Sequence, residues 1–297
     1  YYVIYGTGIY ILMRTKDHER FVAFFSSVAA VFSTAVIVWI MIGHNTKPVV
    51  FAMFPFVILL LEQLRKKFSL LNAALLILVV HIMMEAGHVQ MIFYGILTFG
   101  LYLIFELISR LISKSEPMSV LRAGAVLIVA GAFAFLMSSD RYLSTLEYTP
   151  NSTRGSGPIE SVNTSHQNAE GGNDYDYATM WSYSPGEIML FVVPNYFGFG
   201  KLDYSGPATR GEEVKLPTYW GQKPFDDAAA YMGILIFALA IIGFILNRKD
   251  VFVQFLLFIS LFSLLLSFGK NLPILYDFFY HYVPSFNKFR APSMSLA

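Results

Sequence analysis

Long apolar runs separated by short polar segments make up most of the chain. A helix needs about 20 apolar residues to cross the hydrocarbon of a bilayer. The pattern predicts six transmembrane helices in residues 1–137, the first of them truncated, at 1–13, 21–42, 49–64, 68–84, 91–108 and 120–137. A polar segment, 138–227, precedes spans at 228–245 and 251–268 and the start of a truncated span after residue 290. We therefore expect two transmembrane regions, 1–137 and 228–297, joined by a large loop region, 138–227.

Basic residues fall on alternate connections between these spans. The clusters are Arg14/Lys16/Arg20, Arg65/Lys66/Lys67, Arg110/Lys114 and Arg248/Lys249. Lys and Arg are enriched in cytoplasmic loops of membrane proteins. The predicted cytoplasmic side therefore carries these clusters, and the turns at 43–48 and 85–90 lie on the outer face together with 138–227, 269–290 and the start of the chain.

Composition supports a membrane location. Hydrophobic residues make up 56% of the 297 residues and charged residues only 14%, which is too apolar for an ordinary soluble domain. The net charge is +1, with no basic block longer than residues 65–67, so nothing points to nucleic acid. The absence of cysteine excludes disulfides and thiolate metal sites.

One short helix is expected inside the large loop. Ser184 can act as a helix cap, with Pro185 at the first helical position and Glu187 reaching back as in a capping box. The apolar run that follows, 188–193, stops at Pro194 and is too short to cross a bilayer. A re-entrant or interfacial helix is predicted here.

Two polar turns on the predicted outer face are candidates for chemistry. The first joins the runs 68–84 and 91–108 and contains Glu85, His88 and Gln90; the second contains His44 and Lys47. Ionisable groups near hydrocarbon are costly and usually face a protein interior or a wet cavity. A histidine, a lysine and an amide together can bind a phosphate oxyanion, and helix N-termini at both turns would add backbone N–H groups.

Simpler roles for these residues remain open. Each histidine can cap a helix by bonding to backbone groups. Glu85, three residues before His88 and on the same helix face, can orient His88, hold a sugar hydroxyl or form a structural ion pair. A zinc site made of His81, Glu85 and His88 is disfavoured because the sequence is not HExxH.

Two further groups lie next to predicted spans. Lys288 and Arg290 either place their charges at a helix end, as such residues commonly do, or reach an anionic lipid headgroup. Trp220 and Asp226 suit a sugar, since the ring can stack on it and the carboxylate can accept its hydroxyl protons. An interfacial tryptophan and a helix-capping aspartate are the alternative.

Several short motifs together resemble the YfhO-like bacterial membrane proteins. They are residues 43–47 (GHNTK), 87–94 (GHVQMIFY), 194–198 (PNYFG), 219–221 (YWG) and 287–292 (NKFRAP). That family is similar to GT-C glycosyltransferases, polytopic enzymes that take a sugar from a polyprenyl-phosphate carrier on the outer face and decorate envelope polymers. The resemblance implies a catalytic acid in the first outer loop. The chain begins beyond that loop, so we expect the catalytic residue upstream of Tyr1 and assign it to none of the residues here.

The sequence thus predicts an all-α polytopic membrane protein with a GT-C-like helix bundle in the bacterial cytoplasmic membrane. Its expected function is sugar transfer from a polyprenyl-phosphate donor to a cell-envelope acceptor, with no cofactor indicated. The expected binding residues are His44, Lys47, Glu85, His88, Gln90, Lys288 and Arg290, with possible sugar contacts at Trp220 and Asp226. The alternatives are a transporter or flippase of lipid-linked intermediates, and a non-catalytic membrane scaffold.

Overall fold

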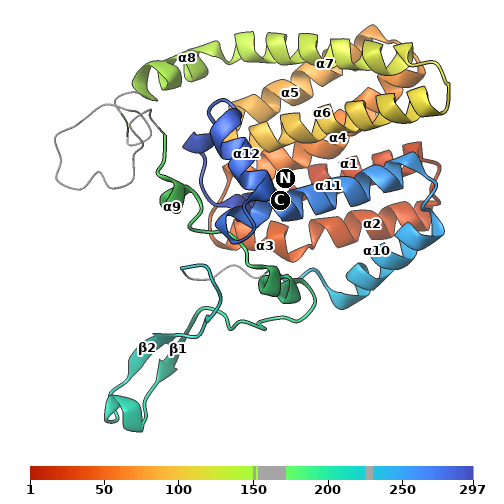
Figure 1. Ribbon diagram of the computed structural model, residues 1–297. Coiled ribbons are helices and arrows are strands. Elements are labelled where there is room, and N and C mark those ends of the chain that lie inside the picture. Colours follow the sequence, from red (N-terminus) through yellow and green to blue (C-terminus); the bar gives the residue numbers. More distant parts are fainter. Residues whose placement is uncertain (150–151, 153–171, 225–229, 297) are drawn as a thin grey trace. The chain divides into compact units, whose positions relative to one another are not determined.

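The computed structural model describes residues 1–149, 152, 172–224 and 230–296. The chain divides into two compact units (Figure 1). Unit 1 comprises Tyr1–Tyr148 and Leu246–Ile259, and unit 2 comprises Thr149–Ile245 and Ser260–Ala297.

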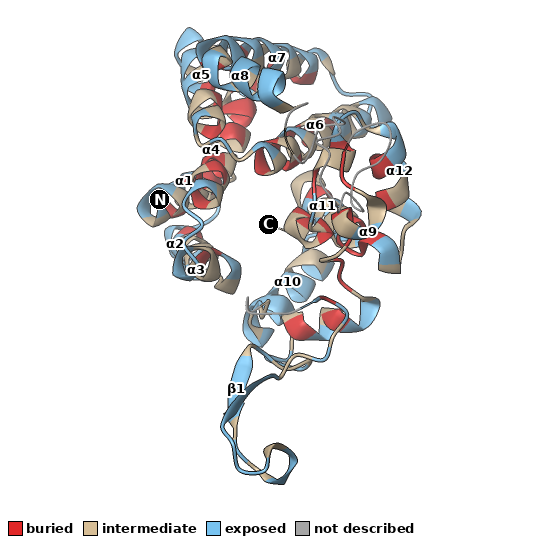
Figure 2. Cartoon of the chain, turned by 90° about the vertical axis from the view of Figure 1, so that its left-hand side faces the viewer, coloured by how far each residue is buried: buried red, intermediate tan, exposed pale blue. Residues whose placement is uncertain are grey.

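Unit 1 is built of helices. They are α1 (Tyr2–Thr15), α2 (Arg20–Val31), α3 (Thr34–Met41), α4 (Thr46–Lys66), α5 (Leu70–Glu85), α6 (Val89–Ile112), α7 (Met118–Met137), α8 (Ser139–Tyr148) and the first half of α11 (Val251–Ser267). Helix α4 packs against α1, α5, α6 and α7 and contributes a large share of the buried residues (Figure 2).

Helix α1 runs parallel to α4. Near its start, the Tyr5 ring lies 4.9 Å from that of Phe51. Near its end, Lys16 Nζ lies 2.8 Å from Glu62 Oε1. Residues near the start of α1 thus contact residues near the start of α4, and residues near its end contact residues near the end of α4. The starts of the two helices therefore lie at the same end of unit 1.

Helix α6 follows the same direction. The rings of Phe54 and Phe99 are 5.2 Å apart, and further along Arg65 Nη2 donates to Glu106 Oε2 at 2.6 Å. Gly95 lies against Phe54, where an added Cβ would come within 3.0 Å of the ring. Glycine therefore lets α4 and α6 approach closely.

Helices α5 and α7 run the opposite way. Arg122, near the start of α7, donates to the carbonyl oxygens of Leu64 and Arg65 at the end of α4. At the other end of unit 1, His81 Nδ1 lies 3.1 Å from the hydroxyl of Ser138, just after α7. The helices thus alternate in direction. The turns at 43–45 and 86–88 share one end of unit 1, here named the turn end.

An ionic network fills the opposite end of unit 1. Glu62 accepts from Lys16, from Arg65 at 3.1 Å and from the Tyr102 hydroxyl, and Arg65 also pairs with Glu106. The side chains of Arg65, Glu62 and Glu106 are 8 to 9% exposed. The sequence pattern assigned Lys16 and Arg65 to basic clusters that mark a membrane side, but they are paired inside the protein.

The predicted span at 21–42 is interrupted. Helix α2 ends at Val31, and α3 starts at Thr34 after Ser33 adopts an extended conformation. Serine and threonine side chains compete with helical backbone bonds, so the Ser33-Thr34 pair marks the break. Taken together, Arg20–Met41 is long and apolar enough to cross a membrane, and only 11% of its most apolar window is buried.

Four segments among the described residues are long and apolar enough to cross a membrane: Arg20–Met41, Thr46–Lys66, Val89–Ile112 and Met118–Met137. Shorter apolar helices are Leu70–Glu85, Ile234–Leu246 and Val251–Ser267. These helices indicate a helical membrane protein. The full count of nine spans and their orientation in the membrane stay predictions.

Unit 2 combines short helices with one hairpin. Its elements are α9 (Tyr175–Ala178), η2 (Pro185–Phe191), β1 (Lys201–Tyr204), η3 (Pro207–Thr209), β2 (Val214–Pro217), α10 (Ile234–Leu246), the second half of α11, η4 (Gly269–Asn271), α12 (Ile274–Tyr282), η5 (Phe286–Lys288) and η6 (Pro292–Leu296). Strands β1 and β2 are antiparallel, with Leu202 opposite Leu216. This hairpin is absent from the all-α prediction.

The helix start predicted at Ser184 is present. The Ser184 backbone N–H donates to Glu187 Oε2 at 2.7 Å, and Pro185 occupies the first helical position. The element is a 3₁₀ helix of seven residues, Pro185–Phe191. The side chain of Glu187 is fully buried, so the capping residue also belongs to the core of unit 2.

Candidate functional site

His88 stands at the N-terminus of α6. Its Nδ1 accepts a hydrogen bond from the Met91 backbone N–H at 3.3 Å, which satisfies one of the donors that a helix start leaves without an intrahelical partner. In the neutral ring the proton is then on Nε2, because Nδ1 is the acceptor. The capping role anticipated from the sequence is therefore real, and it fixes the ring at the helix start.

Gln90 and Glu85 flank His88. The Gln90 side chain donates to the hydroxyl of buried Tyr94 at 3.3 Å. Glu85 ends α5 with an exposed side chain, and its backbone carbonyl accepts a hydrogen bond from Arg141. All three predicted residues of this turn thus lie within one short segment at the turn end.

Arg141 and Tyr142 of α8 cover the same turn. Arg141 binds the Glu85 carbonyl, and the Tyr142 hydroxyl donates to the Met84 carbonyl at 2.8 Å. Burial, more than any neighbouring charge, raises the pKa of the Tyr142 hydroxyl, so this group remains a donor at neutral pH. Sequence reasoning missed Arg141, although a cation directly after a span on the predicted outer face departs from the charge rule.

Gly87 makes this approach possible. Its φ is +72°, a left-handed conformation that costs other residues roughly 1 to 2 kcal/mol. A Cβ at this position would also lie 2.9 Å from Arg141 Nη1. The backbone of the turn therefore favours glycine, and any larger residue would also displace the flexible end of the Arg141 side chain.

His44 and Lys47 lie where α3 turns into α4. Gly43 has a φ of +78°, and the His44 backbone N–H donates to the Trp39 carbonyl at 2.7 Å. Partial burial, followed by the positive charge of Lys47, lowers the pKa of the His44 imidazole. His44 is therefore mainly neutral at pH 7 and can offer hydrogen bonds, while the positive charge of this turn comes from Lys47.

The two turns lie at a common level along the bundle. Phe54 of α4 contacts Gly95 and Phe99 of the parallel helix α6. Counting back seven residues along each helix places Lys47 level with residues 88–92. The predicted groups of the two turns are thus on the same end of unit 1, at the N-termini of two parallel helices.

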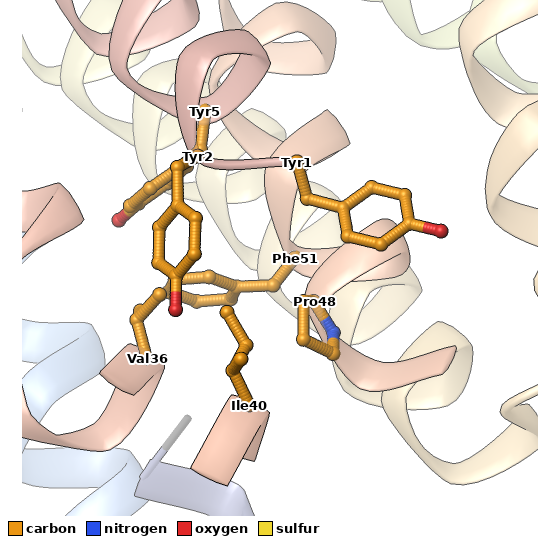
Figure 3. Close-up of a pocket in the computed structure, with 7 residues that line it drawn as sticks. All are labelled: Tyr1, Tyr2, Tyr5, Val36, Ile40, Pro48 and Phe51. Carbon is orange, nitrogen blue, oxygen red and sulfur yellow. The ribbon is translucent and has the colours of Figure 1, made fainter. Parts of the chain in front are cut away.

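A small apolar pocket lies between α1, α3 and α4 (Figure 3). Its aromatic wall includes the rings of Tyr1, Tyr2 and Phe51. The complete lining is Tyr1, Tyr2, Tyr5, Val36, Ile40, Pro48 and Phe51. Pro48 follows Lys47 in the sequence, and Lys47 itself does not line this pocket.

Lys288 and Arg290 belong to unit 2. The Arg290 guanidinium donates to the Tyr177 hydroxyl at 2.6 Å and lies 5.6 Å from the ring centroids of both Tyr177 and Trp181. The next residue, Ala291, has a φ of +58°, and its N–H donates to the Ala178 carbonyl. Arg290 is held against two aromatic rings in an exposed position, while Lys288 ends η5 nearby.

Trp220 also belongs to unit 2. Its ring is 4.3 Å from that of Phe197 and 6.2 Å from that of Tyr196, and its side chain is 64% exposed. This arrangement suits both a sugar platform and an interfacial anchor. Asp226, its predicted partner, lies outside the described residues.

A buried support lies beneath this segment. Tyr219 donates through its hydroxyl to the buried Glu187 carboxylate and accepts from the Lys223 backbone N–H at 3.0 Å. The Lys223 ammonium is buried over the Tyr183 ring at 4.3 Å. Glu187 and Lys223 were not predicted as site residues, and their burial indicates that they position the 219–223 segment.

Metal ligation is not favoured at the turn end. His81 Nδ1 lies by Ser138 and His88 Nδ1 caps α6. Within the described ranges, no group of three or more His, Asp or Glu side chains is placed to hold a metal ion.

Comparison with known proteins gives no match to a family model, a curated protein or a solved structure. The class that the fold defines is that of a helical membrane protein. The YfhO-like resemblance remains a hypothesis that rests on the short motifs.

Proposed function

We propose that this protein is a membrane glycosyltransferase of GT-C type that binds a polyprenyl-phosphate-linked sugar at the turn end of unit 1. The observation that carries the proposal is the pairing of two helix N-termini at one end of the bundle. Lys47 lies at the start of α4, and His88 and Gln90 lie at the start of α6. Helix N-termini favour anions because their N–H groups and dipoles point toward the ligand.

Further groups at the turn end would support binding of a phosphate. The apolar pocket lined by Pro48 is too small to hold a hydrocarbon chain, so the group that the start of α4 offers to a phosphate is Lys47. Arg141 adds a second cation close to Gly87. His44, neutral at pH 7, would contribute hydrogen bonds rather than charge.

These residues would assist the departing phosphate. In a direct displacement, the bond between the anomeric carbon and the phosphate oxygen breaks as the acceptor oxygen bonds to that carbon. The acceptor hydroxyl gives its proton to a base, the carboxylate that the GT-C resemblance implies, and negative charge grows on the phosphate. Lys47, Arg141 and the helix N-termini would stabilise that charge without reorganising. Lys288, Arg290 and Trp220 belong to unit 2 and stay separate candidates for binding a phosphate or a sugar.

Transfer of radiolabelled sugar from a polyprenyl-phosphate donor by the whole protein tests the proposal. We expect Lys47→Met and His88→Asn to lower turnover at least tenfold. Asparagine is a good helix N-cap, so His88→Asn keeps the cap and removes the imidazole. Lys67→Met, which alters an exposed lysine at the opposite end of unit 1, is the control. Unchanged turnover in both variants would remove the site assignment.

A second candidate, a transporter or flippase of lipid-linked intermediates, is favoured by a different observation. The segment Arg20–Met41 is broken at Ser33, and broken helices are common in transporters. Reconstituted protein that moves a fluorescent polyprenyl phosphate across a bilayer, without transferring sugar in the assay above, would establish this function and exclude the first.

A further inference from the structure

Helix α12 carries an apolar stripe on its exposed face. Ile274, Phe278 and Tyr282 are 81%, 55% and 75% exposed, and their spacing of four residues places them on one side of the helix. The opposite side is buried in unit 2 through Tyr276, Phe279 and others. Three large side chains in a row on a nine-residue helix are more than a scattering of single exposed apolar residues.

One ring contact shows which part of α11 lies beside α12. The ring of Phe279 lies 5.9 Å from that of Phe262 in α11, edge to face. Phe262 lies five residues before the end of α11 at Ser267, which is about 7.5 Å along the helix axis. Helix α12 is therefore level with the last turns of an apolar helix of 17 residues, the lower end of the range that spans a bilayer.

The acidic residue of α12 is engaged in a hydrogen bond. Asp277 is the only acidic residue in the helix, and its Oδ1 accepts a hydrogen bond from the Tyr175 hydroxyl at 2.5 Å. Burial and this carboxylate both raise the pKa of Tyr175, so its hydroxyl stays protonated and the pair persists across the neutral range. The exposed side thus presents Ile, Phe and Tyr together with the imidazole of His281, and the Asp277 carboxylate is engaged by Tyr175.

We propose that α12 lies in the bilayer interface and inserts Ile274, Phe278 and Tyr282 among the lipid headgroups and upper acyl chains. An interfacial helix buries its apolar face about 5 to 10 Å into this region, which agrees with the level set by Phe262. Tyr282 at the end of the stripe suits the headgroup zone, where tyrosine is enriched. The inference rests on the membrane class and not on glycosyltransferase activity.

A spin-label depth measurement tests this placement. The chain has no cysteine, so single cysteines can be introduced at Ile274, Phe278 and Tyr282 and labelled with a nitroxide in the whole protein. In lipid nanodiscs with one copy each, we expect collisions with oxygen to exceed those with a polar nickel complex at all three sites. Glu213→Cys, at an exposed hairpin residue, is the aqueous control and should show the reverse.

Two results would overturn the proposal. Aqueous collision ratios at all three stripe positions in nanodiscs would show that the face does not enter lipid. Protection that appears in detergent and rises with protein concentration, together with dipolar broadening between labels, would show that a second copy covers the stripe. Because these cysteines replace exposed side chains, retention of the wild-type thermal midpoint checks that each variant is folded.

Discussion

At the scale of single residues, Glu62 links three helices of unit 1 through hydrogen bonds to its carboxylate. It accepts from Lys16 of α1, from Arg65 of its own helix and from Tyr102 of α6. Removing one partner of a buried ion pair leaves the others with uncompensated charge and costs about 3 to 5 kcal/mol. We expect Glu62→Gln to lower the free energy of unfolding by an amount of this order.

Unfolding in mixed micelles measures that loss. Glu19→Gln changes an exposed glutamate in the same unit and should shift the free energy by less than about 0.5 kcal/mol. Equal stabilities of the two variants would show that the network contributes nothing to folding.

His44 provides a pH-dependent prediction. Its pKa lies below the ordinary value of 6.5, first through burial and second through Lys47. Protonation is thus less favourable in the folded protein than in the unfolded chain. The stabilising contribution is complete above the unfolded pKa, about 6.5, and is lost as the pH falls below it.

Histidine NMR titration can follow this group directly, with its signal assigned by His44→Asn. We expect a midpoint below 6.5 and an upward shift in Lys47→Gln. The shift should be only partial, because burial is the larger cause. A midpoint at or above the ordinary value would contradict the described environment of the turn.

At the scale of elements, the two glycine turns offer a matched comparison. Gly43 and Gly87 both have left-handed backbones, with φ of +78° and +72°. A Cβ at Gly43 would meet nothing within 4 Å, whereas one at Gly87 would press on Arg141. Gly43→Ala should cost about 1 to 2 kcal/mol from the backbone alone.

Gly87→Ala should cost more, since Arg141 must also move. Thermal unfolding of both variants, with and without Arg141→Ala, isolates this contribution. In the Arg141→Ala background, we expect Gly87→Ala to lower the free energy of unfolding by less than it does in the wild type. The loss caused by Gly43→Ala should be the same in both backgrounds. An equal effect on both would show that Arg141 does not contact the turn.

Elements were predictable from sequence where the apolar pattern was long and continuous. Thr46–Lys66, Val89–Ile112 and Met118–Met137 each match an expected span. The break at Ser33 was missed because the apolar pattern continues through it, and only local backbone geometry ends α2. The β1–β2 hairpin was missed because its strands are four residues each and largely exposed, so they carry little hydrophobic signal.

The site was predictable only in part. Both Gly-His turns could be recognised because polar residues interrupt apolar runs. Arg141 and Tyr142 could not, since their role depends on α8 folding back over the end of α5. The Lys16–Glu62 and Tyr219–Glu187 pairings link residues 46 and 32 positions apart, which spacing along the chain does not reveal.

At the scale of the whole molecule, the alternation of helices in unit 1 leads to a topology prediction. Single cysteines at Asn45 and Val89, at the turn end, should react with an impermeant maleimide added to intact cells. Cysteines at Lys67 and Lys114 should react only after permeabilisation, because basic connections are cytoplasmic. The opposite labelling pattern would place the proposed site on the cytoplasmic face and contradict outer-face chemistry.

The central claim is that the starts of α4 and α6 together bind a lipid-linked phosphate. Direct binding of a short-chain polyprenyl phosphate to the whole protein, measured by native mass spectrometry, tests it without requiring turnover. The account predicts one bound lipid per protein and at least tenfold weaker binding for both Lys47→Met and His88→Asn, with Lys67→Met unaffected. Binding that is equal in all four proteins would contradict it.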